Sequence, residues 1–262
     1  MSEISLQMYT LRNHMKTLPE LEDTLRRVAG IGYKNVQISV PAFATVEQVA
    51  ELLNKYGLSA DSVFAPSLEI TRRMDEILNH SKALKTRVLR TDSIPADWAK
   101  FEQGFHDYAK VLNEAGRALK KNGMEILYYH FHAFEWIRFE SGVRGIDILL
   151  NETDPDCVGF QPDVFWLTSA GTEPSESIGM FKGRAAYMHV KDYAITVRTE
   201  HLESVPRAYA PVGQGNLNWP RLIPAARAAG IRRFVVEQDE CQGDEFARVR
   251  ESFEALNRMG VH

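Results

Sequence analysis

The sequence predicts a single-domain (β/α)₈ barrel spanning residues 1–262. Short runs rich in β-branched and aromatic residues alternate with helical patterns eight times along the chain. This alternation requires a parallel sheet, because each parallel step needs a crossover, and eight such units fit the roughly 250 residues of an α/β barrel. The sequence also lacks GxGxxG and GxxxxGK[ST], the phosphate-binding motifs of open nucleotide-binding sheets, and this favours closure into a barrel.

The eight predicted strands are short apolar runs, several of which are followed directly by polar residues. In chain order they cover residues 5–11, 35–40, 60–65, 86–91, 125–132, 158–165, 185–191 and 233–238.

The predicted helices between them carry apolar residues at spacings of three and four. Three such faces are Leu21, Leu25 and Val28; Val46, Val49, Leu52 and Leu53; and Phe101, Phe105, Tyr108, Val111, Leu112 and Leu119. Several helices are followed by a glycine suited to a C-terminal cap, at Gly30, Gly32, Gly57, Gly123 and Gly230. The irregular stretch 194–215 follows the seventh strand and is predicted to be a long βα loop, of the kind that builds barrel active sites.

Composition and charge narrow the classes of partner. Hydrophobic residues make up 44% and charged residues 25%, as in an ordinary soluble globular protein. The net charge of −4 gives no general attraction to nucleic acid or anionic membranes, so we expect a small-molecule partner and neither of those two. Two distant cysteines, no signal peptide and no long apolar run lead us to expect a cytoplasmic location. We also expect a homo-oligomer, as for many barrels of this size.

Polar residues gather at the ends of the later strands, where barrel enzymes hold their catalytic groups. Asp163, His189 and Glu237 each follow an apolar strand, on three neighbouring strands. Imidazole and carboxylate groups converging from adjacent strands are ligands for a divalent metal ion. A salt bridge or a cap explains any one of them equally well, but the three together favour a metal site.

The fifth strand adds two histidines that lie two residues apart and so face the same way. His130 and His132 would both look into the barrel mouth, although each alone is equally well explained as a hydrogen-bonded core histidine. Glu135, a turn further on, is either a general base, a metal ligand or a solvated loop carboxylate. Lys191 shares the strand face of His189 and is predicted to stabilise a developing oxyanion, whereas Asp192 points the other way and is structural.

Five further residues are candidate substrate contacts. Gln7, Tyr9 and Arg90 would reach substrate hydroxyl or carbonyl groups, with packing at the barrel end as the alternative. Trp136 and Trp166 lie just past the fifth and sixth strands and would wall a sugar-sized pocket, or serve only in aromatic packing.

Six stretches together resemble the sugar phosphate isomerase/epimerase family, the xylose isomerase-like barrels. They are LQMYTLR at 6–12, YYHFHAFEW at 128–136, VGFQPDVFW at 158–166, YMHVKDY at 187–193, VGQGNLNWPRL at 212–222 and VVEQDE at 235–240. The stretch at 128–136 is the most specific, because it is similar to the YHNHxxEF variant of one branch.

The resemblance implies one divalent metal ion held by residues from strands five to eight. Mn²⁺ is the first expectation, with Zn²⁺, Mg²⁺ or Co²⁺ as alternatives. Asp163, His189 and Glu237 match the ligand positions of strands six, seven and eight. Better-known members have a glutamate on strand five where this chain has His130, so the fourth ligand is either His130 or Glu135. Glu135 also suits the second catalytic carboxylate expected in sugar epimerases.

The chemistry implied by the resemblance is proton removal beside a ketone. The main hypothesis is an isomerase or epimerase acting on a keto sugar or sugar-like ketone, with Glu135 or His132 as the base. The alternative is a lyase or dehydratase that eliminates from a 3-keto sugar or keto-cyclitol at the same site. A DNA-repair nuclease would need extra histidines on the early strands, which residues 62–65 lack. A non-enzymatic barrel is disfavoured because three of the candidate ligands are present.

Overall fold

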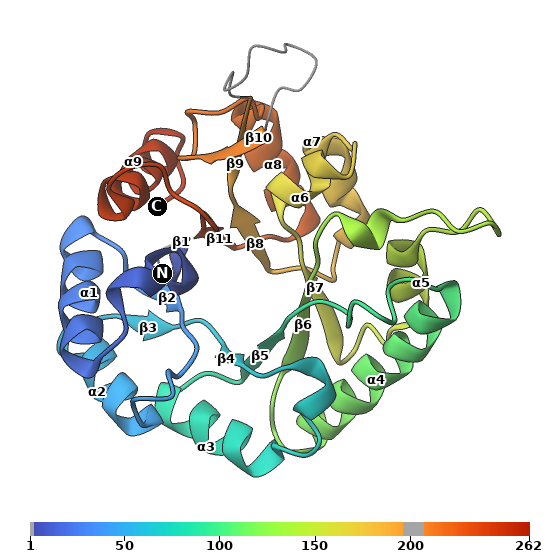
Figure 1. Cartoon of the computed structure of the whole chain (residues 1–262), viewed down its shortest axis with the longest axis horizontal. Coiled ribbons are helices and arrows are strands. Elements are labelled where there is room, and N and C mark those ends of the chain that lie inside the picture. Colours follow the sequence, from blue (N-terminus) through green and yellow to red (C-terminus); the bar gives the residue numbers. More distant parts are fainter. Residues whose placement is uncertain (1–2, 196–206) are drawn as a thin grey trace.

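The computed structural model describes residues 3–195 and 207–262 of the chain. A ring of parallel strands lies at the centre, and helices surround it (Figure 1). The barrel strands are β1 (Ile4–Gln7), β2 (Asn35–Gln37), β3 (Ser59–Ala60), β4 (Val63–Phe64), β5 (Val88–Thr91), β6 (Ile126–His130), β7 (Val158–Gln161), β8 (Tyr187–Val190) and β11 (Arg233–Val236).

The strands pair in two parallel sheets that together make the barrel wall. One sheet has the order β3-β2-β1-β11-β8 and the other the order β4-β5-β6-β7. A parallel bridge between Asp163 and His189 joins the end of β7 to β8, and β3 is followed after two residues by β4. The predicted (β/α)₈ barrel is therefore confirmed.

The helices cover the outside of the ring. They are α1 (Leu18–Ile31), α2 (Val46–Lys55), α3 (Met74–Leu84), α4 (Glu102–Lys121), α5 (Gly145–Glu152), α6 (Val164–Ser169), α7 (Pro174–Ser177), α8 (Trp219–Ala229) and α9 (Glu245–Arg258). The predicted apolar faces of α1 and α2 are buried, as are the predicted α4 positions except two. Val111 is half-buried, and Phe101 was wrongly predicted as a face residue, because it precedes α4 as its N-cap and is 64% exposed. In the described part of the chain, no helix is both long and apolar enough to cross a membrane.

Most strands are shorter than the sequence predicts, and the differences have local causes. The first predicted strand ends at Gln7, where the side chain accepts a hydrogen bond from the Tyr9 amide and starts the 3₁₀ helix Met8–His14. The sixth ends at Gln161, because Pro162 has no N–H to donate and the Asp163 carboxylate caps α6 through the amides of Phe165 and Trp166. Each ending places a polar side chain at the mouth of the barrel.

The stretch predicted as a long loop at 194–215 contains parts of two strands. Strands β9 (Asp192–Ile195) and β10 (Arg207–Ala210) pair antiparallel beyond β8, while residues 196–206 lie outside the described residues.

One buried carboxylate holds the residues that flank the β9–β10 pair in place. The oxygens of Asp192 accept hydrogen bonds from the backbone amides of Tyr193, Gly213, Gly215 and Leu217 and from the indole Nε1 of Trp219, over 2.7–3.2 Å. A Cβ at residue 215 would collide with this carboxylate, which explains the glycine there. The structural role predicted for Asp192 is confirmed.

Candidate active site

A cavity of about 620 Å³ opens at the carboxyl ends of the barrel strands. Of the predicted site residues, its wall includes Gln7, Tyr9, Arg90, His130, His132, His189 and Glu237; among the others in the wall are Arg12, Asp92 and Asp239. A neighbouring hollow of about 600 Å³ between α2 and α3 shares part of this wall, but it holds none of the candidate metal ligands.

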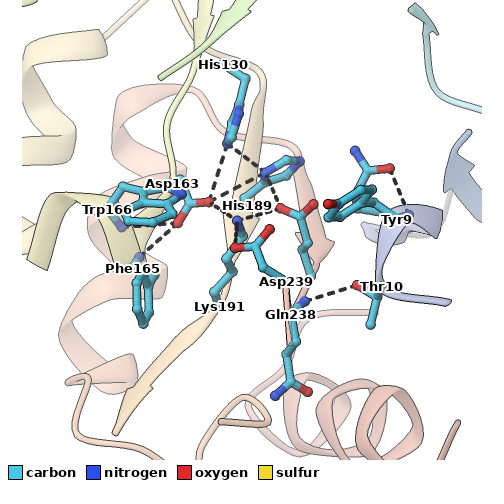
Figure 2. A network of polar contacts seen from close by, with 12 residues as sticks. Tyr9, Thr10, His130, Asp163, Phe165, Trp166, His189, Lys191, Gln238 and Asp239 are labelled. Atoms are coloured by element: carbon cyan, nitrogen blue, oxygen red, sulfur yellow. Dashed lines mark hydrogen bonds and ion pairs between the residues drawn. The ribbon is translucent and has the colours of Figure 1, made fainter. Parts of the chain in front are cut away.

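Four predicted ligands meet beside the cavity. His130 ends β6, Asp163 follows β7, His189 lies in β8 and Glu237 follows β11. One ligand atom from each lies within 4.8 Å of the others, and all four residues are buried. Figure 2 shows three of them converging from their separate strands. Neighbouring parallel strands thus place the four groups at one level of the barrel.

The candidate ligand atoms of this group lie close enough together to bind a single ion. Nδ1 of His189 lies 3.0 Å from Nε2 of His130, 2.9 Å from Oε2 of Glu237 and 3.6 Å from Oδ2 of Asp163. Nε2 of His130 lies 3.4 Å from the same Asp163 oxygen. Two imidazole nitrogens and two carboxylate oxygens therefore point into one small volume.

A glutamine network fixes which nitrogen of His189 faces the group. Nε2 of His189 lies 3.0 Å from Oε1 of Gln37, an acceptor, so Nε2 carries a proton and Nδ1 is the nitrogen that faces the cluster. The Gln37 amide also exchanges hydrogen bonds with Gln161 and accepts one from Gln7. Gln37 and Gln161 were not predicted as site residues. The feature of the sequence that could have indicated them is their position at the carboxyl ends of β2 and β7.

This arrangement fits a divalent metal ion. Metal-bound histidines ordinarily donate their second N–H to an oxygen acceptor, as His189 does to Gln37. Two imidazoles and two carboxylates are a ligand set that Mn²⁺, Zn²⁺ and related ions accept. His130 completes this set at the position where a glutamate was expected.

Lys191 lies inside the same group of charges. Its Nζ is 3.0 Å from Oδ2 of Asp163, 2.8 Å from Oε2 of Glu237 and 2.9 Å from Oδ2 of Asp239, with the side chain 1% exposed (Figure 2). The ammonium group is therefore a counter-ion for three carboxylates. It does not belong to the cavity wall, but it lies directly behind the candidate metal ligands.

The charged groups of the cluster stabilise one another in their ionised forms. Burial opposes ionisation of Asp163 and Glu237, but Lys191 and His189 outweigh it and hold the pKa of both carboxyls below the usual range. Burial likewise opposes the charge on Lys191, yet the three carboxylates raise its pKa well above the ordinary value. For His130, burial and the neighbouring His189 lower the pKa well below the usual range, so its imidazole is neutral and able to act as a ligand.

His132 lies in the cavity wall beside His130, with ring centroids 4.8 Å apart. Its ring stacks on Phe134 and contacts Trp166, and its buried Nδ1 has no hydrogen-bond partner among the described residues. Burial lowers the pKa of His132, so the imidazole is neutral at ordinary pH. Of the predicted bases, this is the one that the structure brings to the cavity.

Glu135 is placed elsewhere, contrary to the expectation of a cavity base or ligand. The 3₁₀ turn Phe134–Trp136 directs its fully buried side chain to the Tyr129 hydroxyl and to the His132 amide, which donates over 2.9 Å. Burial raises the pKa of Glu135 to about 8, although these two hydrogen bonds partly oppose the shift. Glu135 supports the backbone of His132 and lies outside both the cavity wall and the metal-ligand group.

The two tryptophans also differ from expectation. Trp136 is 9% exposed and packs on Phe131, away from the cavity wall. Trp166 also lies outside that wall, where its ring contacts His132 and lies 5.6 Å from Nζ of Lys191 (Figure 2). Both therefore pack behind the site, and Trp166 supports two of its members.

The remaining predicted contacts do line the cavity. Tyr9 is 52% exposed at its rim, Gln7 is buried in the glutamine network, and Arg90 is 7% exposed. Sequence reasoning missed Arg12 and Asp239, which face the same space. Arg12 donates to the backbone carbonyls of Tyr9 and Asp239 over 3.0 and 2.6 Å, and its guanidinium stacks on the Tyr9 ring.

Comparisons with known proteins agree with this architecture. The model of the xylose isomerase-like TIM barrel family matches residues 25–259. An inosose dehydratase of Geobacillus kaustophilus is 32% identical over 123 residues, which is 47% of this chain and 34% of that protein, so the match spans about a third of the relative's length.

Two solved structures share the fold. A sugar phosphate isomerase/epimerase from Parabacteroides distasonis superposes with a TM-score of 0.77 at 22% identity, covering 97% of this chain and 93% of the other. The probable 3-DHS dehydratase of Bacillus anthracis has a TM-score of 0.72 at 13% identity, covering 97% and 98%.

Proposed function

Because this chain belongs to the xylose isomerase-like TIM barrel family, we propose that it is a metal-dependent lyase, a dehydratase that removes water from a polyhydroxy ketone. One observation carries the proposal: the buried group of His130, Asp163, His189 and Glu237 opens on a cavity beside His132, a neutral histidine whose ring Nδ1 has no hydrogen-bond partner among the described residues. The relative named inosose dehydratase supports elimination as the reaction. Mn²⁺ is the first candidate for the ion.

The ligand group would hold the metal ion and leave room for a substrate oxygen. When bound, a divalent ion supplies a Lewis acid that withdraws electron density from a ketone and makes the neighbouring C–H more acidic. Gln37 holds His189 in the tautomer that presents Nδ1. Lys191 neutralises Asp163 and Glu237 from behind and adds a positive field where negative charge develops on the substrate oxygen.

His132 would move the proton. Its neutral imidazole takes the proton from the carbon beside the ketone, and the C–H electrons form a carbon–carbon double bond. The C–O bond at the next carbon breaks, and the departing hydroxyl leaves as water with the proton that His132 collected. One acid–base residue is therefore enough for the reaction, and Glu135 keeps the His132 backbone in place.

The number of acid–base residues that each reaction needs favours elimination, which needs one, over epimerisation, which needs two. Inversion of a carbon centre requires a proton donor on the face opposite the base. Among the described residues of the cavity wall, Asp239 is ion-paired with Lys191, which leaves the exposed Asp92 after β5 as the carboxylate that could serve as this donor. An isomerase or epimerase is the second candidate, supported by the similarity to the Parabacteroides distasonis structure.

Metal content tests the ligand group first. We expect about one Mn²⁺ per chain for wild type and loss of that ion in Asp163→Ala and Glu237→Gln, measured by elemental analysis after dialysis. Glu237→Gln is included because Asp163 also caps α6, so its removal would strain the fold. Asp239→Asn is the matched control: it loses a carboxylate bound to the same Lys191 but should retain the metal.

Product analysis separates the two reactions. Loaded enzyme is incubated with an inosose and, separately, with ketoses in D₂O, and products are weighed by mass spectrometry. A product lighter by one water supports the dehydratase. A product with one carbon-bound deuterium and no loss of water would identify an isomerase or epimerase. Absence of metal binding by wild type would overturn both.

A further inference from the structure

Arg90 is a buried cation that has no anionic partner in the part of the chain that the structure describes. It lies in β5, is 7% exposed, and belongs to the cavity wall. Among the described residues, no carboxylate lies within ion-pair distance of its guanidinium, and its buried Nε has no hydrogen-bond partner. One face of the guanidinium is covered by the Phe64 ring, whose centroid lies 4.8 Å away.

This arrangement is costly unless something pairs with Arg90. An arginine cannot escape the cost by losing its proton, because its pKa remains above the range of protein chemistry. Burial does lower the pKa of Arg90, and Glu237 and Asp92 offset that shift only from a distance. A buried guanidinium that faces a cavity is therefore matched to an anion that enters the cavity.

Arg12 provides the internal comparison. It lines the same cavity, but its N–H groups are engaged by two backbone carbonyls and its face by Tyr9. Arg12 thus holds the loops after β1 and β11 together, whereas the N–H groups of Arg90 are left for a ligand.

We propose that Arg90 binds a carboxylate of the substrate, so that the enzyme acts on a hydroxylated keto acid with its ketone at the His130–Asp163–His189–Glu237 group. The position of the ketone rests on the proposed function; the anion site stands on Arg90 alone. A single planar guanidinium supported by an aromatic ring matches a carboxylate through two parallel hydrogen bonds. A phosphate, with nearly twice the charge, is ordinarily met by several donors, and here the second arginine is already engaged.

Binding of a matched acid and ester tests the anion site without catalysis. Shikimate and methyl shikimate differ by one methyl group, which removes the charge of the carboxylate, and titration calorimetry gives a Kd for each. We expect wild type to bind the acid at least tenfold more tightly than the ester, both with Mn²⁺ and after treatment with chelator. Arg90→Met should lose this preference and Arg90→Lys should keep part of it, with folding checked by circular dichroism.

Arg12→Met is the matched control, because it removes one positive charge from the same cavity. It should keep most of the preference for the acid, because the Arg12 guanidinium is engaged by the Tyr9 and Asp239 carbonyls and contributes only through the field of its charge. Equal affinity of wild type for acid and ester would overturn the proposal, as would a preference that persists in Arg90→Met. Arg90-dependent binding of inorganic phosphate without a preference for shikimate would replace the carboxylate by a phosphate.

The two proposals fail in different ways. Equal kcat/KM of wild type and Arg90→Met on a neutral inosose, together with no acid preference, would leave the dehydratase standing and overturn the carboxylate site. An acid preference in a protein that binds no metal would do the reverse.

Discussion

Two arginines reach into the barrel from opposite ends, and within residues 3–195 and 207–262 only one of them has a carboxylate partner. Arg233, at the start of β11, places its Nε 2.9 Å from Oδ1 of Asp61. Since β1 and β2 separate β11 from β3 in the sheet, this pair crosses the interior. Arg90, near the end of β5, faces the open cavity, and no described carboxylate pairs with it.

The difference separates a structural charge from a functional one. At the closed end of the barrel, Asp61 satisfies Arg233, and the pair contributes to the fold. At the mouth, the fold leaves Arg90 to be satisfied by a ligand. Glu135 shows a third solution, because an acid can take up a proton when no cation is near, whereas an arginine cannot.

The largest expected effect tests the closed end. Asp61→Ala leaves Arg233 without its carboxylate and should lower the free energy of unfolding by roughly 4 kcal/mol, since breaking a buried pair exposes an uncompensated charge. The measurement is urea unfolding at pH 8, above the pKa of about 6 to which burial raises Asp61. Metal content should be unchanged.

Arg90→Met is the counterpart at the mouth. Because Arg90 has no carboxylate partner among the residues that the structure describes, we expect its removal to change the free energy of unfolding by less than about 1 kcal/mol, or to increase it. A loss as large as that of Asp61→Ala would mean that Arg90 is structural after all, and the contrast between the two ends would disappear.

The next effect concerns the pH dependence of stability. The folded-state pKa of Glu135, about 8, lies above its ordinary value of 4.5. The stability contributed by its bound proton is therefore fully present below the unfolded pKa and is lost as the pH rises through 8. Between about pH 5 and 7.5, this group should lower the free energy of unfolding by roughly 1.4 kcal/mol per pH unit, about 3 kcal/mol in all.

Glu135→Gln keeps the shape of that side chain and removes its titration. The variant should show a flatter stability curve than wild type over the same pH range, recorded by urea unfolding in a series of buffers. Parallel curves for the two proteins would show that Glu135 is ionised in the folded state.

The smallest effect concerns metal affinity. Gln37→Leu removes the acceptor for Nε2–H of His189, so the ring loses the contact that fixes its tautomer. We expect Mn²⁺ affinity to fall by about 10- to 100-fold with the fold intact, measured by competition with a chelator. Gln48→Leu on the exposed start of α2 is a control that should retain wild-type affinity.

The sequence was sufficient for the barrel and for grouping three of the four candidate ligands, because both depend on regular features, but it left the fourth open between His130 and Glu135. Strand ends are legible from apolar runs, and parallel strands bring their ends to one level, so Asp163, His189 and Glu237 could be grouped. Glu135 could not be placed, because the short 3₁₀ turn that carries it reverses its direction toward Tyr129.

Contacts between distant residues were the second obstacle. Gln37 and His189 are 152 positions apart, and a neutral amide at a strand end carries no sign of the imidazole it serves. The isolation of Arg90 was equally invisible, because a missing partner is a property of all surrounding residues together. The sequence showed an arginine near the mouth, and only the packing reveals that its charge is unmatched.

The Asp192 carboxylate acts as a clasp between two parts of the chain that follow β8. Among the described residues, its five donors are Tyr193, Gly213, Gly215, Leu217 and Trp219, so one side chain joins the start of β9 to the residues that lead into α8. His189 and Lys191 lie just before this clasp, so the backbone that carries them is held on both sides, by β8 and by Asp192. A change at Asp192 would therefore reach the candidate metal ligands through the backbone, without altering any of them.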